Sequence, residues 1–395
     1  MALKNITEGN FEGKRVIARF DFNVPLDKND PTKITDTSRI DLAIPTIKYL
    51  LEAGVSKLTL MSHHGRPKGK VNLDFSLEPV ADYLAEKLGE EVILTEAAVD
   101  NGVKELLTLK GTKIVLLQNL RFHPEEEAGD VEFARKLSEY GDIYVNDAFG
   151  AAHRKHASTY TINKFFHGHA YAGLLMQKEI ESLDKILNSP AKPFVAVVGG
   201  AKVSDKIKTI EKLLVSVDNL IIGGAMAYPF LKANGFKVGK SLCSEEDVKL
   251  ASSIIRADRA KKLVLPVDHI VSSEFGGVAE QDNETNIPED KMALDIGPST
   301  IVKYSDILKK AKTVLWNGPM GAFELADYAK GTMALCEVIA GLDAFTLVGG
   351  GDSVSAVNKS GFADRFSHVS TGGGASLEYI ERGELPGVQA LKFGV

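Results

Sequence analysis

Short apolar runs rich in β-branched residues recur along the whole chain, and this repetition constrains the fold more than any other feature. Each run ends in a loop rich in Gly, Asn, Asp, Arg or His and leads into a stretch of helical periodicity. Runs that are apolar on both faces suit parallel strands covered by helices on both sides, so the pattern predicts an α/β fold. The runs cover residues 15–24, 57–62, 113–119 and 143–149 in the first half, and 194–200, 219–225, 262–270, 313–319 and 345–351 in the second.

Two hydrophobic cores are expected, because the chain has 395 residues and a single core rarely grows past ~250–300 residues. Between the two sets of runs, apolar side chains stand at helical spacing until Pro190 and Pro193 stop the pattern. The sequence therefore predicts two doubly wound, Rossmann-like parallel-sheet domains joined by a central helix. The predicted boundaries are 1–175 for the first domain, 176–192 for the helix, 193–379 for the second domain, and 380–395 for a tail that packs back on the first domain.

Composition excludes several classes of protein. Hydrophobic residues make up 44% of the chain and charged residues 25%, which is usual for a folded globular protein. The formal net charge of −6 gives no global attraction to nucleic acid, so any anion must be bound by local clusters of cations. Cys243 and Cys336 lack CxxC spacing, which argues against a zinc site or a disulfide framework. With no signal-peptide pattern and no run of ~20 apolar residues, we expect a cytoplasmic protein without a membrane partner.

The loops after the predicted strands of the first half are rich in arginine and histidine. In parallel α/β sheets, ligands bind outside the carboxyl ends of the strands, so these loops are where function is expected. Guanidinium groups bind carboxylates and phosphates in a bidentate manner, which favours a small organic anion with several charges. The polar residues concerned are Asp21 and Asn23, His63 and Arg66, Arg121, and Arg154.

The corresponding loops of the second half are rich in glycine and carry two lysines. Glycines before a helix let backbone N–H groups approach phosphates, and the helix dipole adds a favourable potential, so these loops predict a nucleotide site. Structural roles remain open for single residues. Lys202 fits an anion at a strand–helix boundary and equally fits a lysine that reaches solvent. Asp352 and Ser353 fit helix caps, and Glu324 fits an exposed helix acid. His63 and His64 have no further histidine at metal-ligand spacing, which argues against a metal site there.

Two motif searches narrow the function. Residues 235–241 resemble a Walker A loop but have one residue too few between the glycines, so they do not make a P-loop. No GxGxxG follows the first strand, which makes an NAD-dependent dehydrogenase the weaker interpretation. A two-lobed protein that binds an anion without chemistry is a further alternative.

Eight segments stand out in order along the chain: RFDFNVP, SHHGRP, LRFHPEEE, VNDAFGAAHR, GGAKVSDK, WNGPMGAFE, GGGDS and STGGGASLE. They resemble the motifs of the phosphoglycerate kinase family, and the resemblance extends over essentially the whole sequence. It implies a hinge-bending kinase that acts as a monomer in glycolysis. It also implies reversible Mg²⁺-dependent transfer between 1,3-bisphosphoglycerate and ADP, giving 3-phosphoglycerate and ATP by direct in-line transfer without a general base. Two departures are His64, where an apolar residue is expected, and Gln118, where Glu is expected.

The resemblance also implies roles for individual residues. Arg39 and Lys202 would stabilise the transferring group, and Asp352 would hold Mg²⁺. The 3-phosphoglycerate site would comprise Asp21, Asn23, Arg39, His63, Arg66, Arg121 and Arg154. The ATP or ADP site would comprise Lys202 and Lys206, Asn317, Glu324 at the ribose, Gly350, Gly351, Asp352, Ser353, and Gly372, Gly373 and Gly374.

Overall fold

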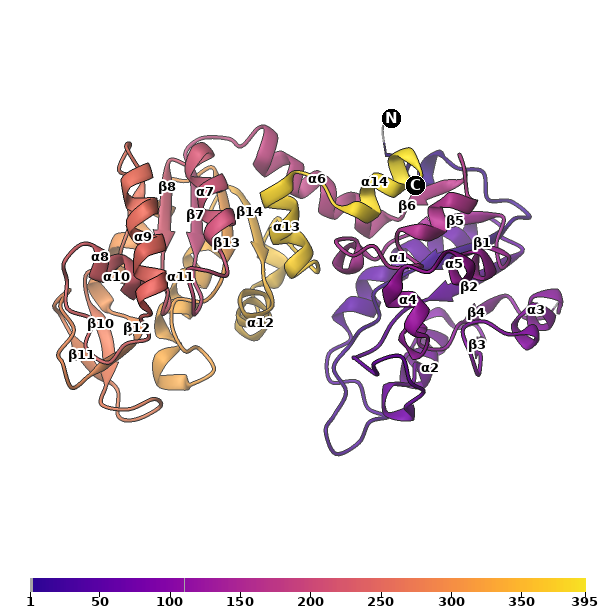
Figure 1. Ribbon diagram of the computed structural model, residues 1–395, viewed down its shortest axis with the longest axis horizontal. Helices are drawn as coiled ribbons and strands as arrows, with labels where there is room; N and C mark the ends of the chain where they lie inside the picture. Colours follow the sequence, from indigo (N-terminus) through magenta and orange to yellow (C-terminus); the bar gives the residue numbers. More distant parts are fainter. Residues whose placement is uncertain (1–2, 110) are drawn as a thin grey trace. The chain divides into compact units, whose positions relative to one another are not determined.

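The computed structural model of the protein describes residues 3–109 and 111–395, which divide into two compact units (Figure 1). Unit 1 comprises Met1–Glu181 and Glu384–Val395, and unit 2 comprises Ser182–Gly383. Each unit is built around its own six-stranded parallel sheet within the described residues, so the α/β class predicted from the apolar runs is confirmed.

The parallel sheet of unit 1 has the strand order β3-β4-β2-β1-β5-β6. Its strands are β1 (Arg15–Arg19), β2 (Lys57–Met61), β3 (Val92–Leu94), β4 (Ile114–Leu116), β5 (Ile143–Asn146) and β6 (Ala170–Ala172). Its helices are α1 (Ser38–Glu52), α2 (Glu78–Leu88), α3 (Asn101–Thr108), α4 (Pro124–Ala128), α5 (Val131–Ser138) and α14 (Pro386–Phe393).

Burial on both faces explains why the central strands of unit 1 are continuous apolar runs. Every residue of β2 is buried, and so are the residues of β1 that pair with it beyond Arg15. The edge strands β3 and β6 are three residues long, and β3 is only half-buried, so their short runs did not stand out in the sequence. At the end of the chain, α14 lies beside β6 (Figure 1).

The parallel sheet of unit 2 has the order β15-β14-β13-β7-β8-β9. Numbered from its own first strand, this is the 3-2-1-4-5-6 order of dinucleotide-binding folds. Its strands are β7 (Phe194–Val198), β8 (Asn219–Ile222), β9 (Leu263–Val264), β13 (Thr313–Asn317), β14 (Phe345–Gly349) and β15 (His368–Val369). Its helices are α7 (Ile207–Ser216), α8 (Ala227–Ala233), α9 (Glu245–Ala257), α10 (Pro298–Leu308), α11 (Lys330–Ala340), α12 (Gly351–Ser360) and α13 (Gly374–Arg382), while α6 (Leu174–Asn188) spans the division between the units.

Unit 2 also contains an antiparallel sheet that the sequence did not predict. It consists of β10 (His269–Ser272), β11 (Glu280–Asp282) and β12 (Met292–Ile296), in the order β11-β10-β12. The apolar run at 262–270 is therefore not one strand, because β9 ends at Val264 and β10 begins a separate sheet. Pro266 lies between them, and a proline cannot donate the hydrogen bond that would continue a strand inside a sheet.

Within residues 3–109 and 111–395, no helix combines the length and apolar character that crossing a bilayer requires.

Candidate active site

Each parallel sheet has a point where the strand order reverses, and several of the polar residues singled out in the sequence lie in the loops there. In unit 1 the chain places β2 on one side of β1 and β5 on the other, so the loops after these strands open at one edge. In unit 2 the same relation holds for β7, which lies between β8 and β13. Ligand sites are expected at these reversals because adjacent loops diverge there.

The loop after β1 is tied to the loop after β2. Arg39, near the start of α1, donates from Nη1 to Asp21 Oδ1 at 3.2 Å and to the carbonyl oxygen of Asn23 at 3.1 Å. The side-chain oxygen of Asn23 accepts from the backbone N–H of Gly65 at 2.8 Å. Arg121 Nη1 donates to the carbonyl oxygen of Gly65 at 2.7 Å. Four predicted substrate residues thus share one hydrogen-bonded network.

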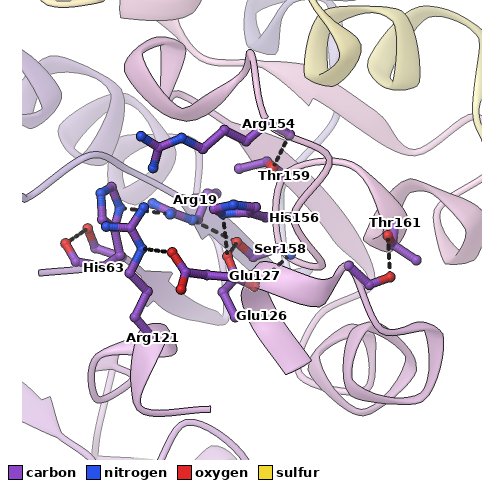
Figure 2. Close-up of polar contacts among 12 residues, drawn as sticks. Arg19, His63, Arg121, Glu126, Glu127, Arg154, His156, Ser158, Thr159 and Thr161 are labelled. Carbon is purple, nitrogen blue, oxygen red and sulfur yellow. Dashed lines mark hydrogen bonds and ion pairs between the residues drawn. The ribbon is translucent and has the colours of Figure 1, made fainter. Parts of the chain in front are cut away.

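A second network, centred on Arg19, was not recognised in the sequence (Figure 2). Arg19 is the last residue of β1 and is fully buried. Its Nε donates to Ser158 Oγ at 2.8 Å, and its Nη2 lies 3.0 Å from His63 Nδ1. Glu126, also fully buried, accepts from the Ser158 backbone N–H at 3.0 Å and from its hydroxyl at 2.6 Å. Ser158 therefore links a buried guanidinium to a buried carboxyl group.

His63 is neutral in this environment. Burial lowers its pKa well below the ordinary value, and the surrounding guanidinium groups of Arg19, Arg121, Arg154 and Arg39 lower it further. Because a guanidinium can only donate, His63 Nδ1 accepts from Arg19, and the ring proton resides on Nε2. His63 therefore keeps one N–H that can donate to an anion.

His156 is neutral for the same reasons. Burial, followed by the charges of Arg19, Arg121 and Arg154, lowers its pKa to about 3. Its Nδ1 lies 3.9 Å from Glu126 Oε1, and with an uncharged imidazole this contact is not an ion pair. The histidines add polar groups to the cluster without adding charge.

Positive charge exceeds negative charge in the unit 1 cluster. Asp21 pairs with Arg39, Glu127 Oε1 lies 3.2 Å from Arg121 Nε, and Glu126 is the largest charge opposing the burial of Arg19. Arg154 donates from Nε to the neighbouring ring of His153 at 3.1 Å and lies close enough to lower the pKa values of His63 and His156. Its guanidinium extends toward the arginine and histidine group in Figure 2. Such a cluster attracts anions.

The reversal point of unit 2 is occupied by the side chain of Lys206. Its Nζ donates to the carbonyl oxygen of Gly199 at 2.7 Å, to the carbonyl oxygen of Asn317 at 3.1 Å, and to Asn317 Oδ1 at 2.5 Å. Burial lowers the pKa of Lys206 to about 8, although the nearby charges of Asp352 and Asp205 oppose the shift. The lysine thus joins the ends of β7 and β13.

Glycines around Lys206 are required by close approach of the backbone. Gly350 has φ +89°, and a Cβ there would lie 2.9 Å from Asn317 Nδ2. Gly318 has φ +104°, and a Cβ there would lie 2.0 Å from the Gly199 carbonyl oxygen. Ser353 accepts a hydrogen bond from the Gly318 backbone N–H. The strand ends are therefore packed closely, Gly318 against backbone and Gly350 against the Asn317 side chain, with α12 starting at Gly351 and α13 at Gly374.

Several predicted residues lie on exposed parts of these loops. Arg66, Lys202, Glu324 and Asp352 are exposed, and Asp352 is in the first turn of α12. Lys202 lies in the connection between β7 and α7, at the strand–helix boundary expected from the sequence, but α7 begins only at Ile207, with Lys206 as its N-cap residue. Turns and bends separate β7 from α7, so Lys202 precedes the helix. Of the glycines near the second helix start, Gly372 is buried and Gly373 has φ +50°.

The family model described as phosphoglycerate kinase matches residues 6–383. The chain belongs to the phosphoglycerate kinase family. Among curated relatives, phosphoglycerate kinase of Anaeromyxobacter dehalogenans (strain 2CP-C) is 51% identical over 99% of this chain and 100% of its own length. Phosphoglycerate kinase of Moorella thermoacetica is 50% identical over 99% of each chain.

Solved structures of the phosphoglycerate kinase family share the fold. The phosphoglycerate kinase of Coxiella burnetii is 39% identical and superimposes with a TM-score of 0.89 over 99% of both chains. That of Pyrococcus horikoshii OT3 is 31% identical, with a TM-score of 0.84 over 99% of both chains. Family membership makes the chain a phosphotransferase, and it decides against the dehydrogenase and the anion-binding protein considered from the sequence.

Proposed function

We propose that the chain catalyses reversible Mg²⁺-dependent phosphoryl transfer between 1,3-bisphosphoglycerate and ADP, giving 3-phosphoglycerate and ATP. The observation that carries the proposal is the family match over residues 6–383 together with two chemically different strand-end clusters. Unit 1 supplies guanidinium groups, and unit 2 supplies glycine backbone with a buried lysine. Two different anions are therefore the natural reactants.

Unit 1 is proposed to bind 3-phosphoglycerate. The hydroxyl and carboxylate end suits Asp21 and Asn23, which Arg39 already holds in place. A phosphate with two negative charges suits Arg121, Arg154 and the Nε2–H of His63. Arg66 completes the predicted set from its exposed position on the loop after β2.

Unit 2 is proposed to bind the nucleotide. The starts of α12 and α13 offer backbone N–H groups beside Gly350, Gly351, Ser353 and the glycines at 372–374. Lys202, Lys206 and Asn317 are proposed to contact the phosphates. Since Lys206 already donates to Gly199 and Asn317, a phosphate oxygen would replace one of these acceptors. Glu324 is proposed to bind the ribose.

Asp352 is proposed to hold Mg²⁺ together with the nucleotide phosphates. Its carboxylate is exposed and lies close enough to Lys206 to oppose the lowering of the lysine pKa. Among the described residues, no three His, Cys, Asp or Glu side chains are arranged to enclose a metal. That fits Mg²⁺, which proteins bind through one or two carboxylates plus substrate phosphates. The ion would neutralise phosphate charge.

The protein needs no general base for this reaction. A β-phosphate oxygen of ADP attacks the acyl phosphate in one direction, and the 3-phosphoglycerate carboxylate attacks ATP in the other, and both are ionised near neutrality. The obstacle is repulsion, because two unit charges ~4 Å apart cost ~4 kcal/mol at an effective dielectric of 20. We assign Arg39 and Lys202 to offset this repulsion at the in-line transferring group.

The proposal assigns the reactants to different units, so we expect both substrates together to bring the units closer about the helix at 176–192. The domain boundaries 1–175 and 193–379 and the monomeric state belong to the same proposal. Small-angle scattering tests it, since the radius of gyration should fall only when both substrates are bound. An unchanged radius would contradict hinge closure.

Turnover is the direct test of the proposed reaction. The purified protein should consume 3-phosphoglycerate with MgATP, followed by NADH loss in a coupled assay. Omitting Mg²⁺ should abolish the signal. Lys237→Ala is the matched control for a substitution of Lys202, because the Lys237 side chain lies on unit 2 and is 70% exposed. No turnover with active coupling enzymes would refute the function.

A further inference from the structure

His64 belongs to the loop after β2, and its ring contacts the loop after β1. Both loops carry proposed substrate residues, but the proposed function gives His64 no role. It follows His63 and precedes Gly65, and its side chain is buried. Its backbone is fixed separately from its ring, since its N–H donates to Asn119 Oδ1 at 3.1 Å and its carbonyl oxygen accepts from Asn119 Nδ2 at 2.7 Å. The contacts with Asn119 therefore do not involve the imidazole ring of His64.

The ring of His64 contacts the backbone of the other loop. Its Nε2 lies 3.0 Å from the carbonyl oxygen of Val24, and its edge packs on the ring of Phe75, with 6.1 Å between centroids. Burial lowers the pKa of His64, so the ring is neutral near neutrality. The carbonyl groups of Val24 and Phe75 both oppose this lowering of the pKa, but within the described residues Nδ1 makes no hydrogen bond, whereas Nε2 lies at hydrogen-bond distance from Val24. A carbonyl oxygen can only accept, so the single ring proton resides on Nε2 and is donated to Val24.

Val24 stands beside the residue that connects the substrate loops. Asn23 accepts from Gly65 N–H through its side chain and from Arg39 through its carbonyl oxygen. The loop after β1 is thus held to the loop after β2 at three successive residues, Phe22 by Ser62, Asn23 by Gly65 and Val24 by His64. Loss of the contact at Val24 removes one of these attachments and leaves the Val24 carbonyl without its imidazole donor.

We propose that His64 is a positioning residue, whose Nε2–H holds the Val24 carbonyl and so orients Asp21 and Asn23 for binding of the 3-phosphoglycerate carboxylate and hydroxyl. This inference rests on the proposed function of unit 1. His64 does not touch the substrate itself. It acts through Val24, and the nucleotide site of unit 2 is independent of it.

Two substitutions separate the hydrogen bond from side-chain volume. His64→Gln keeps an N–H donor of similar reach, and His64→Leu keeps an apolar side chain of comparable size without a donor. With MgATP saturating, His64→Leu should raise the KM for 3-phosphoglycerate about five- to tenfold, the effect of one lost hydrogen bond. The KM for ATP should change less than twofold, and His64→Gln should restore most of the loss. His167→Leu, at an exposed histidine of unit 1, is the matched control.

Two measurements test the role of His64 without relying on turnover. Titration calorimetry with 3-phosphoglycerate should show the same five- to tenfold weakening in His64→Leu and the same recovery in His64→Gln. If the wild-type chain binds 3-phosphoglycerate but does not turn it over, the proposed reaction is wrong. The calorimetry still tests whether His64 positions the substrate loop. Nitrogen-15 chemical shifts of the imidazole in the ligand-free protein should show the Nε2–H tautomer. An Nδ1–H tautomer, or equal affinity in wild type and His64→Leu, would overturn the proposal.

Discussion

The two units place different kinds of residue at the same position of their folds. Both place their functional loops where a parallel sheet reverses its strand order. Unit 1 fills that position with long cationic side chains, of which Arg19 and Arg121 are almost completely buried. Unit 2 fills it with glycine backbone, where Gly318 and Gly350 approach neighbouring strand ends too closely for a side chain. The fold fixes where a ligand binds, and the residues at the strand ends decide which ligand.

The difference has an electrostatic consequence. In unit 1 the buried guanidinium groups hold His63 and His156 in the neutral form. In unit 2 helix starts and backbone N–H groups add positive potential, and they carry no titratable charge. Lys206 is the buried exception, and its pKa is lowered to about 8. Apart from Lys202 and Lys206, substitutions should therefore act through charge in unit 1 and through backbone shape in unit 2.

The largest effect is expected where the proposal places one cation from each unit at the transferring group. Arg39→Ala and Lys202→Ala should each lower kcat by roughly 10²-fold or more, because each is assigned ~3 kcal/mol of transition-state stabilisation. Steady-state kinetics with both substrates saturating measures this. Arg135→Ala, at an exposed residue of α5, should leave kcat unchanged. Near-normal kcat in one variant would show that this residue does not take part in the mechanism, and that the two units do not each supply a cation.

A smaller effect is expected for a residue that binds only the acid. Arg121→Met should raise the KM for 3-phosphoglycerate roughly 30-fold, equivalent to about 2 kcal/mol for a lost charged hydrogen bond. The KM for ATP should stay within twofold. Arg121→Lys should be intermediate, since lysine keeps the charge but lacks the planar fork. Equal effects on both substrates would mean that the units do not divide the reactants.

Backbone shape in unit 2 is tested at glycine. Gly350→Ala should destabilise the protein by about 2 kcal/mol, because alanine is strained at φ +89° and its Cβ would lie 2.9 Å from Asn317 Nδ2. The KM for ATP should rise, and that for 3-phosphoglycerate should not. Gly361→Ala is the matched control, with φ +75° and open space around the Cβ, so strain of about 1 kcal/mol should appear without a kinetic change. Chemical denaturation and kinetics together measure both.

The smallest effect is a proton linkage in unit 2. The pKa of Lys206 is about 8 in the free protein, and a phosphate beside it would raise that pKa, so nucleotide binding should take up protons above pH 8. ADP affinity should therefore fall as pH rises from about 8 toward 9.5, by up to tenfold per pH unit. Calorimetry in buffers of different ionisation enthalpy measures the uptake, which Lys206→Met should abolish. Proton release on binding would contradict the sign.

Sequence patterns predicted the parallel sheets because both faces of their central strands are buried, which makes β2 and β7 continuous apolar runs. They missed β10–β12, since β11 is largely exposed and β12 only partly buried. The strand-end loops pointed to Asp21 and Arg121, whereas Arg39, which lies in the first turn of α1, came only from the family resemblance.

Arg19 was not assigned to the site from the sequence, although it is the first residue of the motif RFDFNVP. It stands inside an apolar run, and its partner Glu126 comes from α4, more than a hundred residues later. Only the folded sheet brings the two residues together. An arginine interrupting a strand that is otherwise buried was the signal available, and it does not specify a partner.

The division of reactants between the units is tested most directly by hydrogen exchange with each ligand alone. 3-Phosphoglycerate should slow amide exchange in the loops at 21–25, 62–66, 119–123 and 151–156, and leave unit 2 unchanged. MgADP should slow exchange at 199–206, 317–324, 350–353 and 370–374, and leave the unit 1 loops unchanged. Protection of one and the same unit by both ligands would contradict the account.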